Sequence, residues 1–511
     1  MYMKLNKVLI IFLAMGAFAC TDLEETLRED LSGDQARQLL EENADVSALL
    51  DAAYNSLQGP FQDQSRFWAA QEHTSDEVIG PTRGPDWDDN GVWRVLHNHT
   101  WNADHAFLGD TFNELLQVVF NATNVLVFNP SASQAAEARF LRAFAMFAVA
   151  DGWNQVPYRE PGENLLNAPK VLKGQEALNF IIDELNAIMN DLPDGPPTRA
   201  NKDAAKVLLM KCYLNKGTFA DRANPSFDQA DMNQVITLAD AIINSGKYSL
   251  ADNDFDNFAP DNGQNSPELI FADENVAGTY VGSGNTVRSR WFCTLHYNQN
   301  PSGWNGFTTI ADFYDKFDPN DQRIGGEYDG QTDVSGIRTG FLVGQQYDQN
   351  GAALQDRKGN PLSFTRDIKL IETGNDLEVT GIRVIKYPID YNNGDNVDND
   401  LVIYRLADVM LMKAEALLRT NKESDARTIV NQIRTKRGVP ALGTLTLDNL
   451  LDERGFELYW EGHRRQDLIR FGKFLNAWTE KPASGQERLL FPIPTQALAV
   501  NPNLEQNPGY N

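Results

Sequence analysis

Apolar residues recur every three or four positions in several long segments, a spacing that predicts amphipathic α-helices. The clearest segments are 136–153, 202–217, 404–420 and 423–438, and segments 174–193 and 231–248 share the spacing. A glycine or a polar turn follows each segment, as expected where a helix ends. Small residues stand where two helices must approach closely: Ala143, Ala204, Ala205, Ala414 and Ala416.

This pattern predicts a mostly α protein with a tetratricopeptide-like helix-pair scaffold over about 36–248 and 401–480, although the full consensus of that repeat is absent. Between 249 and 400 the helical periodicity is lost, and Asn, Asp and Gly dominate. Segments 265–274 and 381–389 are candidates for short strands in this loop-rich part. Loops this long in a compact body are usually functional, so we expect the ligand-binding subregion here.

The first 19 residues have the pattern of a secretory signal peptide. Lys4 and Lys7 precede an apolar run from residue 8 to 19, which is too short to span a bilayer that needs about 20 helical residues. Ala19 comes directly before Cys20, one of only three cysteines, as in a bacterial lipobox. We therefore predict that residues 1–19 are removed, that Cys20 is lipidated, and that a mature chain of residues 20–511 is anchored to a membrane.

The chain is strongly acidic, with a formal net charge of −26, and removing the signal peptide makes it more negative. Nucleic-acid binding depends on neutralising phosphates, so this charge argues against a nucleic-acid partner. Cys212 and Cys293 remain after the anchor, and Cys212 falls within a predicted helix. We expect both to be buried free thiols rather than a disulfide.

The stretch from Arg454 to Phe474 mixes five basic residues with two glutamates, an aspartate and a histidine. It resembles a catalytic cluster or a nucleic-acid surface. Glu453, Glu457 and Glu461 are spaced four apart, which would put them on one face of a helix. We interpret the stretch as a helix tied into the scaffold by ion pairs.

No motif for catalysis or metal binding stands out. The sequence has no H-E-x-x-H, G-x-S-x-G or phosphate-binding glycine loop, and with 71 acidic residues a glycosidase-like carboxylate pair carries no information. His97, His99 and His105 lie near Asp104, but hydrogen bonding explains this cluster as well as a metal does. The segment 390–400 is rich in oxygen ligands yet fails the EF-hand spacing. We expect no catalytic residues, no metal and no cofactor.

Four segments resemble signatures of the SusD/RagB family: 136–158, 385–419, 450–474 and 489–510. With the lipobox they cover nearly the whole mature chain in the expected order. The resemblance implies a cell-surface, outer-membrane lipoprotein of a Bacteroidetes-type bacterium that binds glycan and works with a SusC-like TonB-dependent transporter. It also implies that the protein is not an enzyme.

Binding a sugar requires flat aromatic rings for its C–H face and a few polar groups for its hydroxyls. Trp153, Trp460 and Trp478 are expected in the core, and Trp68 and Trp101 are ambiguous. The resemblance implies that loops after the segment 74–77 and loops of the later half line the glycan site. Because Trp87 and Trp93 lie in a loop rich in Pro, Gly and Asp, we expect exposed rings there. The predicted glycan-binding residues are Trp87, Trp93, Trp304, Arg83, Asp88, Asn90, Trp291 and Tyr297.

The favoured ligand is a neutral glycan, such as the β-glucan laminarin or a fructan, because the acidic chain would repel a polyanion. Basic residues near the predicted tryptophans (Arg83, Arg94, Arg288 and Arg290) could defeat that argument. The alternative is a peptide-binding or assembly lipoprotein of the RagB type. A peptide site would need a strand edge or deep side-chain pockets instead of exposed rings.

Overall fold

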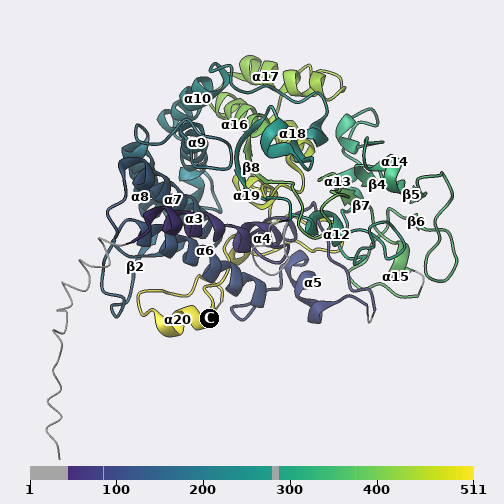
Figure 1. Cartoon of the computed structure of the whole chain (residues 1–511), viewed down its shortest axis with the longest axis horizontal. Helices are drawn as coiled ribbons and strands as arrows, with labels where there is room; N and C mark the ends of the chain where they lie inside the picture. The colour runs from purple at the N-terminus through teal and green to yellow at the C-terminus, as the bar shows by residue number, and fades with distance from the viewer. Residues whose placement is uncertain (1–43, 85, 279–286, 375, 511) are drawn as a thin grey trace, which may run out of the picture. The chain divides into compact units, whose positions relative to one another are not determined.

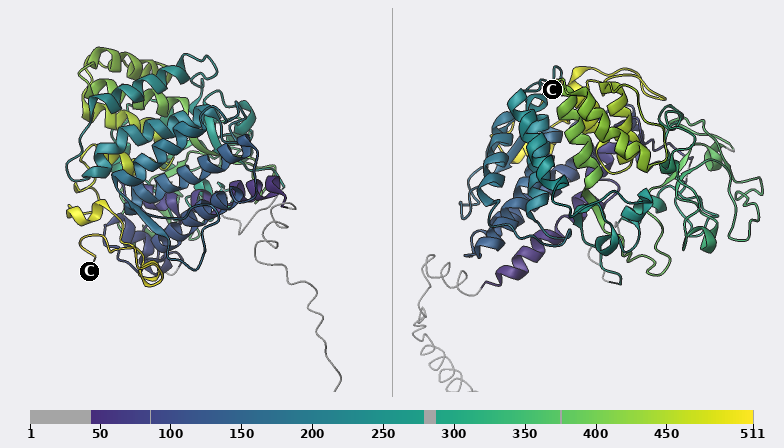
Figure 2. Two further views of the ribbon diagram at one scale, coloured as in Figure 1. Left: turned by 90° about the vertical axis from the view of Figure 1, so that its left-hand side faces the viewer. Right: turned by 90° about the horizontal axis from the view of Figure 1, so that it is seen from above.

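The computed structural model describes residues 44–84, 86–278, 287–374 and 376–510, and residues 45–511 form one compact unit. The predicted anchor residue Cys20 lies outside the described residues. Helices pack against one another on one side of this unit, and a loop-rich part lies on the other side (Figure 1). Two further views show the helices stacked in successive layers (Figure 2). The mostly α prediction is confirmed.

The helical part contains long helices that pack against their neighbours in the chain. They are α3 (Val46–Asn55), α6 (Ala106–Val125), α7 (Ala132–Trp153), α8 (Gln175–Ile188), α9 (Lys202–Ala220), α10 (Gln229–Ile243), α16 (Leu406–Arg419), α17 (Glu423–Lys436) and α18 (Leu447–Leu458). Shorter helices are α4 (Phe67–Glu72), α5 (Val92–His97), α19 (Arg464–Arg470) and α20 (Thr495–Val500). Six of the long helices match the six segments predicted from apolar spacing.

The loop-rich part is held together by short pairings. Its short helices are α11 (Asn262–Asn265), α12 (Ser289–Phe292), α13 (Ala311–Tyr314), α14 (Thr332–Ser335) and α15 (Asp376–Val379). In the described chain each sheet has two antiparallel strands: β1 (Gln155–Tyr158) with β2 (Lys170–Lys173), β3 (Leu269–Asp273) with β8 (Leu401–Arg405), β4 (Gly340–Leu342) with β7 (Arg383–Ile385), and β5 (Gly344–Gln345) with β6 (Ser363–Phe364). The two predicted strands are β3 and β7.

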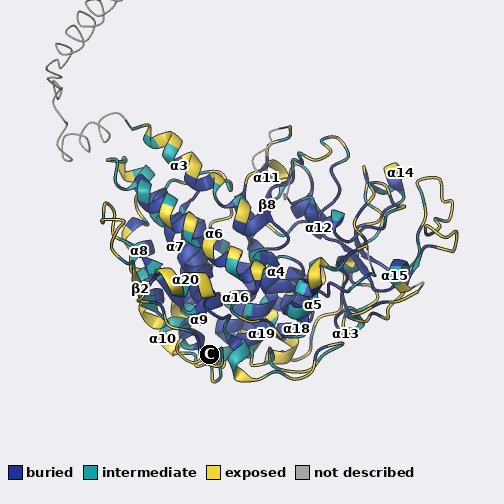
Figure 3. Cartoon of the chain, turned by 90° about the horizontal axis from the view of Figure 1, so that it is seen from below, coloured by how far each residue is buried: buried dark blue, intermediate teal, exposed yellow. Residues whose placement is uncertain are grey.

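Helix α7 shows how local sequence fixes an element. Ser131 caps its start by accepting a hydrogen bond from the Gln134 backbone, and the Gln134 side chain accepts one from the Ser131 backbone, which forms a capping box. The helix ends at Asn154, which adopts a left-handed conformation with φ 61°. Most of its residues are buried, and Figure 3 shows buried residues filling the middle of the molecule. The alanines predicted at helix contacts are buried as well.

The stretch 454–474 is not one helix. Helix α18 ends at Leu458 and α19 begins at Arg464, because Trp460 and Gly462 between them have φ values of 63° and 83°. The predicted single helical face is therefore wrong at Glu461, which lies in the turn.

The ion pairs predicted for this stretch are present, but with other partners. Glu457 accepts hydrogen bonds from Arg323, Arg405 and Arg437 at 2.7–3.0 Å, and these arginines lie outside the stretch. Burial alone would raise the pKa of Glu457, yet the three guanidinium groups hold it well below its usual range. Arg454 pairs instead with Asp467 and Asp408. The stretch is a buried structural cluster.

Candidate functional site

Five of the predicted residues meet in one open cleft. Its volume is about 620 Å³, which suits a small ligand. We call it the aromatic cleft. Its lining residues are Gln64, Ser65, Asp86, Trp87, Asp89, Asn90, Val92, Trp93, Ala106, Phe107, Tyr297 and Trp304.

Trp304 supplies the exposed ring that the sequence predicts. The residue is 41% exposed, and its ring packs edge-to-face on Phe292 with 5.1 Å between centroids. The loop carrying it folds back onto α12 and the turn after it, since the backbone N–H groups of Trp304 and Gly306 donate to the carbonyls of Phe292 and Cys293 at 2.9 and 2.8 Å. This loop therefore holds the Trp304 backbone in place, with the ring open to solvent.

Trp87 and Trp93 line the cleft, but their expected exposure is wrong. They are 7% and 2% exposed, and their rings stack nearly parallel, with centroids 5.7 Å apart and an angle of 13°. Phe307 packs against both in T-shaped arrangements, with interplanar angles of 78° and 67°. A Cβ at Gly306 would come within 2.9 Å of the Trp87 ring, so the loop approaches this closely only because it has glycine there. The pair forms a wall of the cleft rather than a free platform.

The loop between these tryptophans positions two polar groups. Asn90 is exposed in a left-handed conformation with φ 55°, which asparagine tolerates better than most residues. The Trp93 indole N–H donates to the Asp89 carboxylate at 2.7 Å and fixes its orientation. Asp89 and Asn90 are both exposed and line the cleft.

Tyr297 lies half-buried on another side. The Arg357 guanidinium lies over its ring, 4.1 Å from the centroid, so that face is covered. Its hydroxyl oxygen is buried and has no hydrogen-bond partner among the described residues. Burial raises the pKa of Tyr297, which keeps the hydroxyl protonated.

Three predicted residues do not line the cleft. Arg83 is fully buried and donates to the Thr380 carbonyl at 2.9 Å, and burial lowers its pKa to about 10. Asp88 is paired with Arg94 at 2.8 Å. Trp291 is 3% exposed and packs in the core. Arg83 and Trp291 are buried by contacts that local sequence does not reveal, whereas Asp88 is half-buried and its partner Arg94 lies six positions away.

Sequence reasoning also missed lining residues. Asp86 and Asp89 belong to the loop already singled out, so their acidity was the available signal. Gln64 and Ser65 precede α4, and nothing in their local pattern marks them. Gln64 is only 7% exposed, and its Oε1 has no hydrogen-bond partner among the described residues. Such a buried, unpaired polar atom is uncommon in proteins.

The histidine cluster makes hydrogen bonds. His97 contacts the carbonyls of Val78 and Thr479 at 3.1 and 2.9 Å, and His99 contacts the Thr74 carbonyl at 2.8 Å. His105 contacts the Val92 carbonyl. Each of these three histidines therefore has a backbone carbonyl as a hydrogen-bond partner.

In the described part of the chain, one group of carboxylates is close enough to hold a cation: Asp254, Glu268 and Glu457. Arginines already occupy it. Arg437 Nη2 lies 3.2, 3.0 and 2.7 Å from the three carboxylates, and Arg405 Nη1 lies 3.7, 3.1 and 2.9 Å from them. The guanidinium groups supply the positive charge that a metal would bring.

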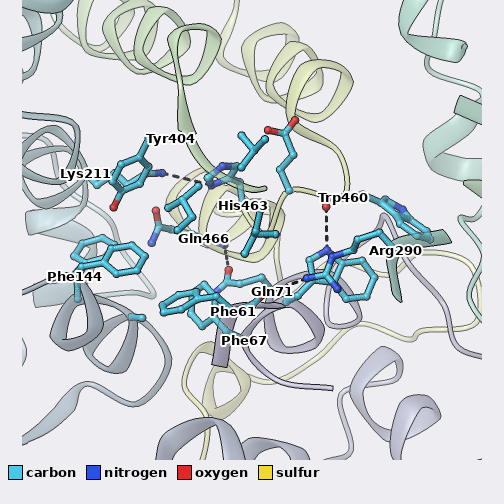
Figure 4. A pocket seen from close by; sticks show the side chains of 18 residues that line it. Phe61, Phe67, Gln71, Phe144, Lys211, Arg290, Tyr404, Trp460, His463 and Gln466 are labelled. Atoms are coloured by element: carbon cyan, nitrogen blue, oxygen red, sulfur yellow. Dashed lines mark hydrogen bonds between the residues drawn. The ribbon is translucent and has the colours of Figure 1, made fainter. Parts of the chain in front are cut away.

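A second cavity lies deep between α4, α7, β8 and the turn before α19 (Figure 4). Its volume of about 80 Å³ leaves room for a few water molecules but not for a sugar ring. Lys211 and His463 face each other across 3.5 Å at one end. Aromatic core residues such as Phe144 and Tyr404 line the rest, so we interpret this cavity as part of the core.

Comparisons with known proteins agree with this architecture. The model of the SusD family matches residues 267–488. The starch-binding protein SusD of Bacteroides thetaiotaomicron is 28% identical over 418 residues, which cover 74% of this chain and 73% of that protein. The chain thus resembles SusD-like proteins in sequence, and the SusD-like proteins that it resembles are carbohydrate-binding proteins rather than enzymes.

Solved structures share the fold. Surface glycan-binding protein A from Bacteroides thetaiotaomicron, in complex with laminarihexaose, superposes with a TM-score of 0.68 at 18% identity, covering 90% of this chain and 98% of that one. A laminarin-binding SusD-like protein superposes with a TM-score of 0.64 at 23% identity, covering 91% and 99%. Within the described residues no helix combines the length and apolarity needed to cross a bilayer.

Proposed function

We propose that this protein captures a glycan in the aromatic cleft. The observation that carries the proposal is an exposed Trp304 ring beside a cleft that also presents Tyr297 and the Trp87 wall. An apolar sugar face can lie on the ring while its hydroxyls reach the polar groups around it. The names of the starch-binding and glycan-binding relatives support the same class of ligand.

The glycan is neutral, most plausibly a β-glucan such as laminarin, with a fructan next. The net charge of −26 opposes the approach of a polyanion. The four arginines near the predicted tryptophans do not line the cleft. The fold shared with a laminarin-binding SusD-like protein is consistent with this choice.

The protein delivers its glycan to a SusC-like TonB-dependent transporter at the outer membrane. A lipid on Cys20 would hold it at the cell surface, and the family resemblance supports the transporter as partner. The RagB-type alternative, a peptide-binding lipoprotein, lacks a specific observation in its favour, because the cleft is lined by rings rather than by a free strand edge.

The test is calorimetry of the full chain, purified in mild detergent, against laminarin, soluble starch, inulin and an unrelated peptide mixture. We expect at least one neutral glycan to bind with a Kd of about 1 µM to 1 mM, the range that stacking on one or two exposed rings gives. Binding of peptides but of no glycan would favour the alternative and contradict the proposal.

A further inference from the structure

One residue that lines the aromatic cleft has an unpaired hydrogen-bond acceptor. Gln64 is more than nine-tenths buried, it lines the cleft, and its Oε1 has no partner among the described residues. Burying such an atom unpaired costs about 1–3 kcal/mol. A ligand that donates a hydrogen bond to it would recover that loss. The buried Tyr297 hydroxyl, also unpaired, can both donate and accept.

The rim of the cleft adds more acceptors and no cation. Asp86 and Asp89 line it, and no lysine or arginine is among its described lining residues. Two arginines contact lining residues: Arg66 donates to the Ser65 hydroxyl and to Glu114, both at 2.7 Å, and Arg357 donates to Asp86 at 2.5 Å and to Glu378 at 3.0 Å. The charge of Arg357 is therefore neutralised twice, and this residue also covers the Tyr297 ring.

From these groups we propose that the cleft selects its glycan by hydrogen-bond donors: Gln64, Asp86 and Asp89 accept from hydroxyl or ammonium groups and exclude uronates. This inference rests on the proposed function. The three residues would determine which charge on a glycan the cleft accepts.

The reason is the chemistry of the sugar substituents. A hydroxyl donates and accepts, so it can satisfy both a carboxylate and an amide oxygen. A protonated amine donates only and is also attracted by the two aspartates. A uronate carboxylate accepts only, so it would face these acceptors and the like charge of Asp89, while Arg357 is already paired with Asp86 and Glu378. The expected order of affinity is amino sugar, then neutral sugar, then uronate.

The test uses matched forms of each neutral glycan: laminarin, soluble starch and inulin, each native, oxidised to the carboxylate at C6, or converted to the 6-amino-6-deoxy form. Affinities for the full chain are measured by calorimetry at two ionic strengths. We expect the glycan that binds in native form to bind about tenfold more weakly when oxidised, and its amino form to bind at least as well as the native one.

Variants separate the roles of the residues. The double substitution Asp86→Asn with Asp89→Asn should reduce the ratio of affinities for native and oxidised glycan to about threefold or less. Gln64→Leu should weaken native binding about tenfold by removing the acceptor. The matched control, Glu176→Gln with Asp183→Asn, removes two exposed charges on α8, away from the cleft, and should change neither quantity.

The outcomes distinguish this inference from the proposed function. If a native glycan binds and its oxidised form binds equally well, the donor selection is wrong while glycan binding stands. If the α8 control loses the preference for native over oxidised glycan as much as the aspartate variant does, the effect is a long-range charge effect. That result would also overturn the donor selection. If no form of any glycan binds, the proposed function falls, and this inference falls with it.

Discussion

At the scale of single residues, the same residue type serves two purposes in this protein. Trp304 is open to solvent, whereas Trp87, Trp93 and Trp291 are buried. Removing a large buried aromatic side chain costs about 3–5 kcal/mol of folding stability, so alanine at Trp93 would test folding rather than binding. Trp304 is therefore the residue whose loss reports on the ligand.

Replacing Trp304→Ala should weaken binding of the neutral glycan roughly tenfold, because about 1–2 kcal/mol of ring contact is lost. The melting temperature should change little, since the ring is already 41% exposed. Calorimetry and thermal unfolding measure the two effects. Phe120→Ala is the matched control, because Phe120 is 43% exposed on α6 and lies outside the aromatic cleft. Equal weakening by both substitutions would show that neither ring is specific.

Sequence alone located the loops of the cleft but not whether each side chain in them is exposed or buried. Pro, Gly and Asp around Trp87 correctly predict a loop. Whether its ring is free depends on Phe307 and Gly306, more than 200 positions away, and no local pattern reports such a contact. Arg83 was misplaced for the same reason, as its partners come from residues 376–380.

At the scale of elements, the turn between α18 and α19 binds distant segments together. The backbone N–H groups of Gly462 and Trp460 donate to the carboxyls of Glu72 and Glu77 at 2.6 and 3.1 Å. Helical spacing predicted one continuous helix here and did not reveal the turn, because a left-handed tryptophan is rare. The buried acids that hold the turn come from α4 and the residues after it.

Burial raises the pKa of Glu72 from 4.5 to about 7, with Glu77, Arg464 and Glu461 as its charged neighbours. Below pH 4.5 the carboxyl is protonated in both the folded and the unfolded chain. As the pH rises toward 7 only the unfolded chain loses the proton, so the free energy of unfolding falls over this interval.

Glu72→Gln should therefore match the natural chain near pH 4.5 and be more stable by about 2 kcal/mol above pH 7. Glutamine keeps the oxygen that accepts from Gly462. Chemical denaturation across pH measures the difference, with Glu176→Gln on α8 as the exposed control. A constant difference between variant and natural chain at every pH would contradict a raised pKa.

At the scale of the whole molecule, the proposed lipid on Cys20 would tie an acidic chain to a membrane through its N-terminal end. The order of helices and loops was predictable because apolar spacing and composition are properties of long segments. The position of the cleft was not, because it joins residues near 64, 90 and 300, which only the folded chain brings together.

Replacing Cys20→Ala should abolish incorporation of a palmitate analogue and release the protein from membranes, since a lipid on that cysteine is the proposed anchor. Metabolic labelling and cell fractionation measure this. Cys212→Ala is the control, because Cys212 is buried in α9. Under mild detergent the natural chain should co-purify with a large TonB-dependent transporter. Unchanged labelling of the Cys20 variant would rule out the anchor, and recovery of the natural chain alone would argue against the transporter.

The central claim is that glycan binds in the aromatic cleft, and a crystal structure of the chain with the neutral glycan that binds best in calorimetry tests it directly. The account predicts a sugar ring against Trp304, with hydroxyls donating to Gln64 and to Asp86 or Asp89. An ordered glycan on another surface, with the cleft unoccupied in the same crystal, would contradict it.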